Sequence, residues 1–245
     1  MGRNYIGGVV NMLSFLKPRQ KAQVPADKAR SLFKRYKWMS LFGVFIGYAA
    51  FYIVRNNFTL STPQLKASLD LSKGQIGMLS SCLLIAYGLG KGVMSAWSDK
   101  ANPKRFMATG LIICALLSMC LAFFGFSLWS LAIILILLGL FQGMGVGPSF
   151  IILSTWFDKK QRGFVTSIWN TSHNLGGGLI SPLAGFMLGI VGASHWRFAI
   201  YVFPALVAIA VALIVLVFVR VDLRKKVCHR WKKQSKNKAT LITMI

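Results

Sequence analysis

Two cations stand inside long apolar segments of this chain. Arg55 follows an apolar run from Ser40 to Val54, and Lys91 lies deep within the next apolar segment. A cation at the centre of a bilayer costs at least about 2.5–3.5 kcal/mol on insertion scales, so it is usually paired or functional. No aspartate lies at the same depth, and the chain contains no Glu. Two unpaired cations that face one cavity would form a binding site for an anion.

Tyrosines share the expected helical faces of both cations. Tyr48, Tyr52 and Arg55 are spaced i, i+4 and i+7, which places them on one face of a helix. Tyr87 and Lys91 are likewise four residues apart. Phenolic hydroxyls can donate hydrogen bonds to phosphate or carboxylate oxygens, and arginine can bind phosphate through two parallel hydrogen bonds. The alternative for Arg55 is snorkelling, in which its long side chain reaches the membrane interface.

A third polar feature is the run from Trp169 to Gly178, which contains the consecutive polar residues 170–174. Such a run is unfavourable in a membrane unless it lines a cavity or bonds to other helices. His173 is its one side chain that changes charge near neutral pH. His173 is therefore either a ligand-binding residue or a hydrogen-bonding partner of another helix. The three glycines that end the run would permit close helix packing or a bend.

Six apolar segments would position these residues, each close to the 20 or so residues that a transmembrane helix needs. Of the 245 residues, 55% are hydrophobic and only 14% are charged. The sequence therefore predicts an all-α membrane protein with six transmembrane helices. The expected spans are 38–60, 75–98, 105–125, 128–152, 163–189 and 196–220.

The basic residues predict the orientation of these spans. Of the 29 Lys and Arg residues, 24 lie before the first span, in the loops after the second and fourth spans, or in the tail, when Arg105 and Arg220 at the edges of spans are counted with the neighbouring loop and tail. The positive-inside rule then places both termini in the cytoplasm, in a bacterial inner (plasma) membrane. A net charge of +24 would suggest nucleic acid in a soluble chain. Here the charge lies between apolar segments, so the lipid bilayer is the expected partner and nucleic acid is not.

Three stretches follow from this division: a basic cytoplasmic segment (1–37), a transmembrane half-domain (38–220) and a basic cytoplasmic tail (221–245), which has the look of out-of-frame sequence. Met12 offers an alternative start to Met1. Four aromatic residues near the expected span ends are predicted to be interfacial anchors: Trp38, Trp129, Trp196 and Tyr201.

The loop between the second and third spans, from Ser98 to Arg105, resembles the signature loop of the major facilitator superfamily. Asp99 is followed there by Lys104 and Arg105, although Ser95 stands where the family usually has Gly. Asp99 would pair with basic residues or cap a helix and so hold the cytoplasmic gate; the alternative is an ordinary loop ion pair. The six spans would then form a 3+3 inverted repeat, which is one half of a major facilitator fold.

Four runs together resemble the organophosphate:phosphate antiporters of that superfamily, over about residues 12–220. That family includes bacterial glycerol-3-phosphate, hexose-phosphate and phosphoglycerate transporters, and a hexose-phosphate sensor. Residues 56–63 and 79–82 are most similar to the phosphoglycerate transporter. The four runs are 46–58, 85–91, 141–145 and 169–178.

The resemblance implies a role for each of these side chains. Arg55 would be one of two arginines that bind the phosphoryl group, Lys91 a second cation nearby, and His173 an aid to substrate binding. Tyr48, Tyr52 and Tyr87 would line the pore. Asn56 departs from the basic residue that some members carry, which leaves that contact open.

The implied activity is transport of a phosphorylated small metabolite in exchange for inorganic phosphate, with no cofactor, metal or catalytic residue. Phosphoglycerate, glycerol 3-phosphate and hexose phosphate all remain open as substrates. The alternative is a membrane sensor of a sugar phosphate that signals to a partner kinase. A membrane enzyme such as a lipid transferase is disfavoured, because the chain has no Glu and no metal-ligand cluster.

The family has two six-span halves, whereas this sequence predicts six spans. We therefore expect the carboxyl-terminal half, with the second phosphate-binding arginine, to be absent and the chain to be inactive alone. The basic tail from Asp222 resembles a truncated or frameshifted end; the alternative is a genuine tail that contacts anionic lipid.

Overall fold

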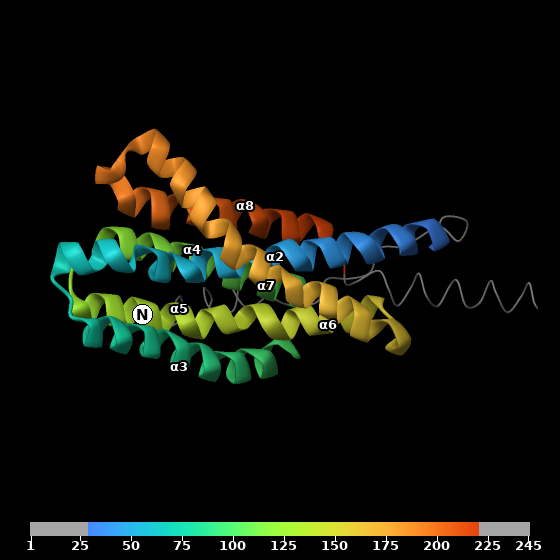
Figure 1. Ribbon diagram of the computed structural model, residues 1–245. Coiled ribbons are helices and arrows are strands. Elements are labelled where there is room, and N and C mark those ends of the chain that lie inside the picture. Colours follow the sequence, from blue (N-terminus) through green and yellow to red (C-terminus); the bar gives the residue numbers. More distant parts are fainter. Residues whose placement is uncertain (1–28, 221–245) are drawn as a thin grey trace, which may run out of the picture.

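The computed structural model describes residues 29–220, and every regular element in that range is a helix (Figure 1). Six helical spans are long and apolar enough to cross a membrane, which confirms the predicted fold class. The expectations for residues 1–28 and 221–245, including the Met12 start and the basic tail, lie outside the described residues. The elements are α2 (Ala29–Leu69), α3 (Lys73–Ser98), α4 (Pro103–Phe124), α5 (Leu128–Gln142), η1 (Gly143–Gly145), α6 (Val146–Trp156), α7 (Lys159–Val191), η2 (Ala193–His195), the π-helical η3 (Phe198–Val202) and α8 (Phe203–Phe218).

Local sequence signals explain several of the helix starts. Ser72 caps α3 by accepting a hydrogen bond from the Gln75 backbone, while the Gln75 side chain accepts one from the Ser72 backbone. Ser127 and Ser130 make the equivalent reciprocal cap at α5. Such boxes satisfy donors that the first turn of a helix leaves free. Pro103 begins α4, where its missing N–H removes no helical hydrogen bond.

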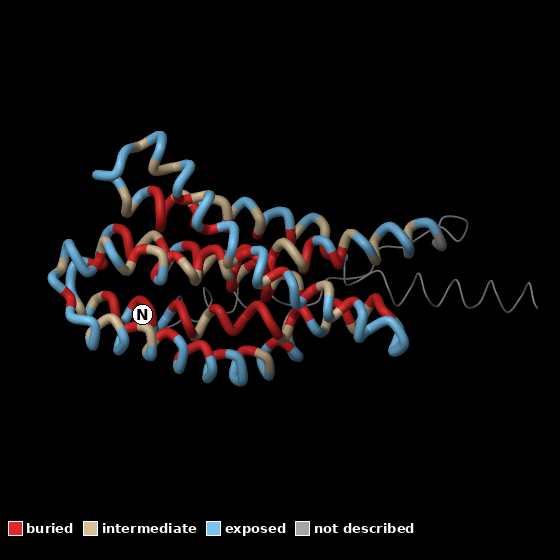
Figure 2. Tube along the Cα trace, in the orientation of Figure 1, coloured by how far each residue is buried: buried red, intermediate tan, exposed pale blue. Residues whose placement is uncertain are grey.

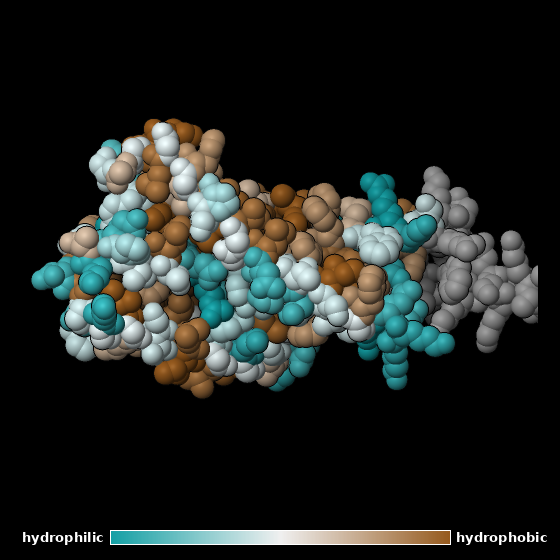
Figure 3. Space-filling model, in the orientation of Figure 1, coloured by the Kyte–Doolittle hydropathy of each residue, from teal (hydrophilic) through white to brown (hydrophobic). Residues whose placement is uncertain are grey.

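The connections alternate between the two ends of the bundle (Figure 1). Residues 70–72, 125–127 and 192–197 lie at one end, and residues 99–102 and 157–158 lie at the other, together with the start of α2 and the end of α8. Figure 3 shows hydrophilic side chains at both ends of the bundle, so the charge of the connections distinguishes them, with Lys100, Lys159 and Lys160 at the second end. The second end therefore carries the loops in which the sequence concentrates its basic residues.

The contacts between helices repeat in two triplets. The α3 helix packs mainly against α5, α2 packs mainly against α7, and α4 packs mainly against α8. If the first span is exchanged with the fourth, the second with the fifth and the third with the sixth, the α3–α5 contact becomes the α7–α2 contact. The α4–α8 contact is unchanged by this exchange. An inverted repeat of two triplets has this property, so the packing agrees with the expected 3+3 arrangement.

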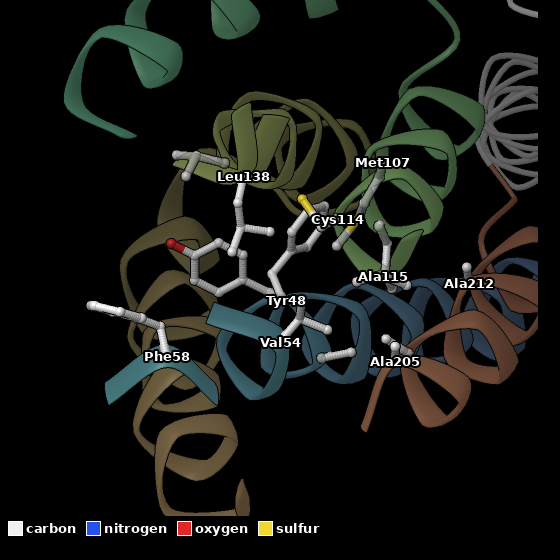
Figure 4. Close-up of a cluster of buried hydrophobic side chains, with 14 of the residues drawn as sticks. Tyr48, Val54, Phe58, Met107, Cys114, Ala115, Leu138, Ala205 and Ala212 are labelled. Carbon is white, nitrogen blue, oxygen red and sulfur yellow. The ribbon is translucent and has the colours of Figure 1, made fainter. Parts of the chain in front are cut away.

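The apolar core lies where α2, α4, α5 and α8 meet (Figure 4). Its labelled members include Val54 from α2, Cys114 from α4, Leu138 from α5 and Ala212 from α8, and all four are buried. Small residues such as the alanines of α8 let these helices approach closely, which is how helices associate in a membrane without a hydrophobic driving force. The core therefore packs α2 against α4, α5 and the last span.

A buried polar network crosses this core. Asn57 donates to Ser118 Oγ at 2.9 Å, and Ser118 donates to the carbonyl oxygen of Tyr201 at 3.1 Å. The Tyr201 and Ser61 hydroxyls hydrogen-bond to each other at 2.5 Å. The prediction that Tyr201 is an interfacial anchor is therefore wrong: the side chain is fully buried and holds α2 against the last span. Trp38 and Trp129, by contrast, are exposed.

The first helix is longer than its apolar span, because α2 begins at Ala29 and continues to Leu69. Its first turns pack against the α6–α7 connection: Phe33 lies 5.5 Å from Trp156 between ring centroids, and Lys37 donates to Gln161 Oε1 at 2.7 Å. These contacts explain why the helix extends into the stretch that was expected to precede the membrane domain. Elsewhere, α3 and α7 are the least buried spans (Figure 2).

Candidate functional site

A cavity of about 420 Å³ lies between α2, α3 and α7. Its volume falls in the range of small-molecule sites, which is roughly 300–1,000 Å³. Helix α2 supplies Arg55, the sole cation of its lining, and α7 supplies His173. The lining residues are Tyr52, Arg55, Asn56, Phe58, Thr59, Ser80, Leu83, Leu84, His173, Asn174 and Gly177.

The Arg55 guanidinium is half-buried against two tyrosine rings. Its Cζ atom lies 4.4 Å from the ring centroid of Tyr87 and 5.4 Å from that of Tyr52. The two tyrosine hydroxyl oxygens are 3.5 Å apart. Cation–π contacts of this kind contribute about 0.5–2 kcal/mol and leave the guanidinium N–H groups free. Arg55 is thus directed into the cavity and retains its donors for an oxyanion.

Lys91 reaches the same tyrosine from further along α3. Its Nζ atom lies 5.4 Å from the Tyr87 ring centroid, so Tyr87 contacts both cations. The Lys91 side chain is exposed and does not line the cavity. The two cations therefore lie near one another, but of the two only Arg55 lines the cavity.

Aligned side chains of α2 and α7 form a ladder. Tyr48 packs on Trp169 with ring centroids 4.5 Å apart, and Tyr52 packs on His173 at 5.3 Å. The next pair at the same four-residue spacing is Asn56 and Gly177, where a Cβ on the glycine would lie 2.9 Å from Asn56 Nδ2. The first two pairs are filled by rings, and the third is left open by the glycine.

Glycine lets the helices that carry the site approach each other. A Cβ atom at Gly176 of α7 would overlap the carbonyl oxygen of Ala49 in α2, and one at Gly90 of α3 would overlap that of Leu140 in α5. Gly90 and Gly176 hold the same position in their helices, counted from the first residue of each. That residue is Lys73 in α3 and Lys159 in α7. The two triplets therefore use glycine at equivalent positions, and both contacts need the absence of a side chain.

The site carries positive charge without a neighbouring carboxylate. The acidic residues within positions 29–220 are Asp70, Asp99 and Asp158, and each lies at a helix end. Arg55 and Lys91, on α2 and α3, have no ion pair in that part of the chain. An anionic ligand would supply the missing negative charge.

The structure thus joins all six predicted binding residues through side-chain contacts. Tyr52, Arg55 and His173 line the cavity, whereas Tyr48, Tyr87 and Lys91 stand behind or beside it. Their roles in binding stay predictions.

Several lining residues had no role in the sequence-based site. Thr59 lies four residues after Arg55, and Gly177 lies four residues after His173. Helical spacing from the predicted residues was therefore a usable signal for both. Which face of α3 would meet them could not be read from spacing alone.

The predicted gating residues lie at the basic-loop end of the bundle, where α3 ends and α4 begins. Asp99 follows the last residue of α3, and Lys104 and Arg105 lie in the first turn of α4. Lys104 donates to the carbonyl oxygen of Leu216 near the end of α8 at 3.3 Å. This contact ties the loop to the last span, and the gating role of the loop stays a prediction.

Comparison with known families and structures gives a consistent result. The family model described as Major Facilitator Superfamily matches residues 44–244. A bacterial homologue of the human lysosomal transporter Spinster, solved in an inward-facing and unoccupied conformation, matches with a TM-score of 0.68 at 20% identity. That match covers 78% of this chain and 44% of the other, and it concerns the fold alone.

Two curated relatives from Salmonella typhimurium are more similar in sequence. The phosphoglycerate transporter protein is 53% identical over 216 residues, which cover 88% of this chain and 46% of that protein. The membrane sensor protein UhpC is 36% identical over 208 residues, which cover 83% of this chain and 45% of that protein. The chain spans about half the length of these relatives.

Proposed function

This chain belongs to the major facilitator superfamily, and we propose that it forms half of a transporter that exchanges a phosphorylated metabolite for inorganic phosphate. The similarity to a phosphoglycerate transporter supports this class of substrate. Phosphoglycerate is accordingly the first substrate to test, ahead of glycerol 3-phosphate and hexose phosphates. The chain is a multi-pass membrane protein, and the proposed activity is binding and release, without catalysis.

The observation that carries the proposal is the position of Arg55. Its guanidinium lines the cavity, lies against Tyr52 and Tyr87, and has no carboxylate partner within residues 29–220. A phosphate dianion would accept hydrogen bonds from Arg55 and neutralise its charge, since arginine can grip phosphate through two parallel bonds.

Neighbouring residues would complete the anion site. Lys91, beyond Tyr87, would add a second positive charge to attract a dianion. His173 lines the cavity beside Tyr52 and has a ring nitrogen that can donate to a phosphate oxygen. Tyr48 would hold Tyr52 in place by ring packing at 5.3 Å.

We further propose a membrane orientation and a partner. The alternation of basic and non-basic connections supports cytoplasmic termini in a bacterial inner membrane, by the positive-inside rule. Alternating access requires two six-helix units that rock about a shared site. Because the chain spans about half of its relatives, a second six-helix unit would cover the open faces of α3 and α7 and supply the remaining phosphate ligands.

Binding of labelled phosphate and 3-phosphoglycerate to the purified chain tests the role of Arg55. We expect Arg55→Ala to weaken binding of both ligands by 100-fold or so, because charged hydrogen bonds to phosphate contribute about 1.5–3 kcal/mol each. Lys66→Ala is the matched control, since Lys66 is an exposed cation in the last turn of the same helix. Unchanged binding by Arg55→Ala would refute the assignment.

The similarity to UhpC favours a second candidate, a membrane sensor of a sugar phosphate that acts through a partner kinase. Both candidates would use the same phosphate site, so binding alone does not separate them. Phosphate exchange by vesicles that contain the chain and a supplied second six-helix unit would support transport. Saturable sugar-phosphate binding without any exchange would instead support the sensor.

A further inference from the structure

On α2 and α3 the cavity lies mainly to one side of Arg55. Beyond Arg55 on α2 it is lined by Asn56, Phe58 and Thr59, whereas on the other side of Arg55 Tyr52 lines it and Tyr48 does not. On α3 the lining includes Ser80 but not Lys91. Most of the α2 and α3 lining therefore lies on the side of Arg55 that faces the connection at residues 70–72, away from the basic loops.

Two amide side chains that line the cavity have no hydrogen-bond partner among residues 29–220. Asn56 on α2 and Asn174 on α7 both line it, and neither forms a hydrogen bond within the described range. Asn56 is half-buried, whereas Asn174 is exposed. A side-chain amide that is removed from solvent normally has a partner in the protein or in water, so the half-buried Asn56 amide, together with the exposed Asn174 amide, has donors and acceptors available for a ligand.

The packing of α7 keeps the space beside Asn56 open. Gly177 occupies the ladder position where Trp169 and His173 carry rings, and its missing side chain leaves the Asn56 amide unobstructed. The lining at this end also contains apolar contacts from Leu83 and Leu84. The space thus combines neutral hydrogen-bonding groups with an apolar wall, and it has no cation besides Arg55.

We propose that Asn56 and Asn174 form a subsite for the carbon-bearing end of the substrate and so distinguish an organophosphate from inorganic phosphate. This inference rests on the proposed function, in which Arg55 holds the phosphate group. Amide N–H groups donate to hydroxyl and carboxylate oxygens, and the leucine side chains contact the carbon atoms. Inorganic phosphate has no atoms that reach this subsite when its oxygens are bound at Arg55.

Equilibrium binding of two probes, 3-phosphoglycerate and inorganic phosphate, to the purified 245-residue chain tests the subsite. We expect Asn56→Ala and Asn174→Ala each to weaken 3-phosphoglycerate binding by about 10-fold, the effect of losing a hydrogen bond to a charged group. Phosphate binding should change by less than about twofold. The thermal midpoint of each variant shows whether it is folded.

A pair of adjacent glycines tests the same subsite without removing an amide. Gly177→Ala places a methyl group 2.9 Å from Asn56 Nδ2, whereas a Cβ at Gly178 meets nothing within 4 Å. We expect Gly177→Ala to reproduce the selective loss of 3-phosphoglycerate binding and Gly178→Ala to bind both probes like the original chain.

Three other outcomes of these binding experiments would contradict the subsite, the proposed function or both. Equal weakening of both probes by the asparagine variants would overturn the subsite, because the amides would then belong to the phosphate position. Unchanged binding of both probes would also overturn it, while leaving the role of Arg55 intact. Failure of the original chain to bind either probe, even when a second six-helix unit is supplied, would refute the proposed function together with this inference.

Discussion

The asparagine side chains on the two sides of α2 differ in whether they have a hydrogen-bond partner in the described part of the protein. Toward α4 and the last span, Asn57 bonds to Ser118, and Ser61 bonds to Tyr201. Toward α3 and α7, the adjacent residues Arg55 and Asn56 face a cavity and form no hydrogen bond within residues 29–220. Residue type alone therefore does not separate the two sides: Asn57 has a protein partner, whereas the neighbouring Asn56 has none within residues 29–220.

The difference has an energetic consequence. A satisfied hydrogen bond between membrane helices stabilises the fold by about 0.6–2 kcal/mol. A cation without a carboxylate partner instead makes the folded protein less stable, since it retains much of its cost of insertion. We expect substitutions on the closed side of α2 to reduce stability, and substitutions on the open side to reduce ligand binding.

Gly176→Ala should give the largest change in stability. The added methyl group would overlap the Ala49 carbonyl, and backbone atoms cannot rotate away as a flexible side chain can. We expect a loss of about 3 kcal/mol in the free energy of unfolding, at the upper end for overpacked sites. Thermal unfolding in lipid nanodiscs would measure it, with Gly185→Ala as the control because a Cβ there meets nothing within 4 Å. Equal thermal midpoints would show that α2 and α7 do not pack so closely.

The adjacent asparagines give the next largest effect and the sharpest contrast. Asn57→Ala removes the donor to Ser118 and should lower the free energy of unfolding by about 1–2 kcal/mol. Asn56→Ala removes no hydrogen bond within the described residues, so its stability should change by less than about 0.5 kcal/mol. Chemical or thermal unfolding of the two variants side by side is the measurement. A larger loss for Asn56→Ala would contradict the contrast between the two sides.

The sequence was sufficient to predict the fold because apolar length and loop charge act locally along the chain. It was insufficient for the ends of α2, since the helix is extended by contacts with residues more than a hundred positions away, such as Gln161. Tyr201 was misassigned for the same reason: its type and place suit an interface, but its partner Ser61 belongs to the first span.

Only part of the candidate site could be predicted from the sequence. Helical spacing predicted that Tyr52 and Arg55 share a face, and the structure places both on the cavity. Spacing within one helix carries no information on which faces meet, so the position of the cavity relative to Lys91 was not predictable. Gly90 and Gly176 decide that arrangement through contacts with the backbones of other helices.

Removal of the Arg55 charge should stabilise the fold slightly. Arg55→Met keeps the length of the side chain but removes a cation that has no carboxylate partner among residues 29–220. The insertion cost of about 2.5–3.5 kcal/mol exceeds the roughly 0.5–2 kcal/mol that cation–π contacts return, so we expect a gain of about 1 kcal/mol. Unfolding in lipid nanodiscs without phosphate would measure it. A loss of stability would mean that Arg55 stabilises the packing of α2 and α3, which is a structural role, and would argue against a role in ligand binding.

The smallest effect should separate two pairs of hydroxyl groups. Tyr201→Phe removes the short, buried bond to Ser61 and should cost about 1 kcal/mol, a typical net value for one hydrogen bond. Tyr87→Phe removes a long contact of 3.5 Å to the Tyr52 hydroxyl and an interaction with the Tyr48 hydroxyl, so its stability should fall by less than that of Tyr201→Phe, by about 0.5 kcal/mol. The effect of phosphate on the thermal midpoint should depend more on Tyr87 than on Tyr201. The Tyr87 side chain lies beside Arg55, whereas the Tyr201 hydroxyl lies on the side of α2 that packs against α4 and the last span. Phosphate should therefore raise the thermal midpoint of Tyr87→Phe by less than that of Tyr201→Phe, and an equal rise in both would place Tyr87 among the structural residues.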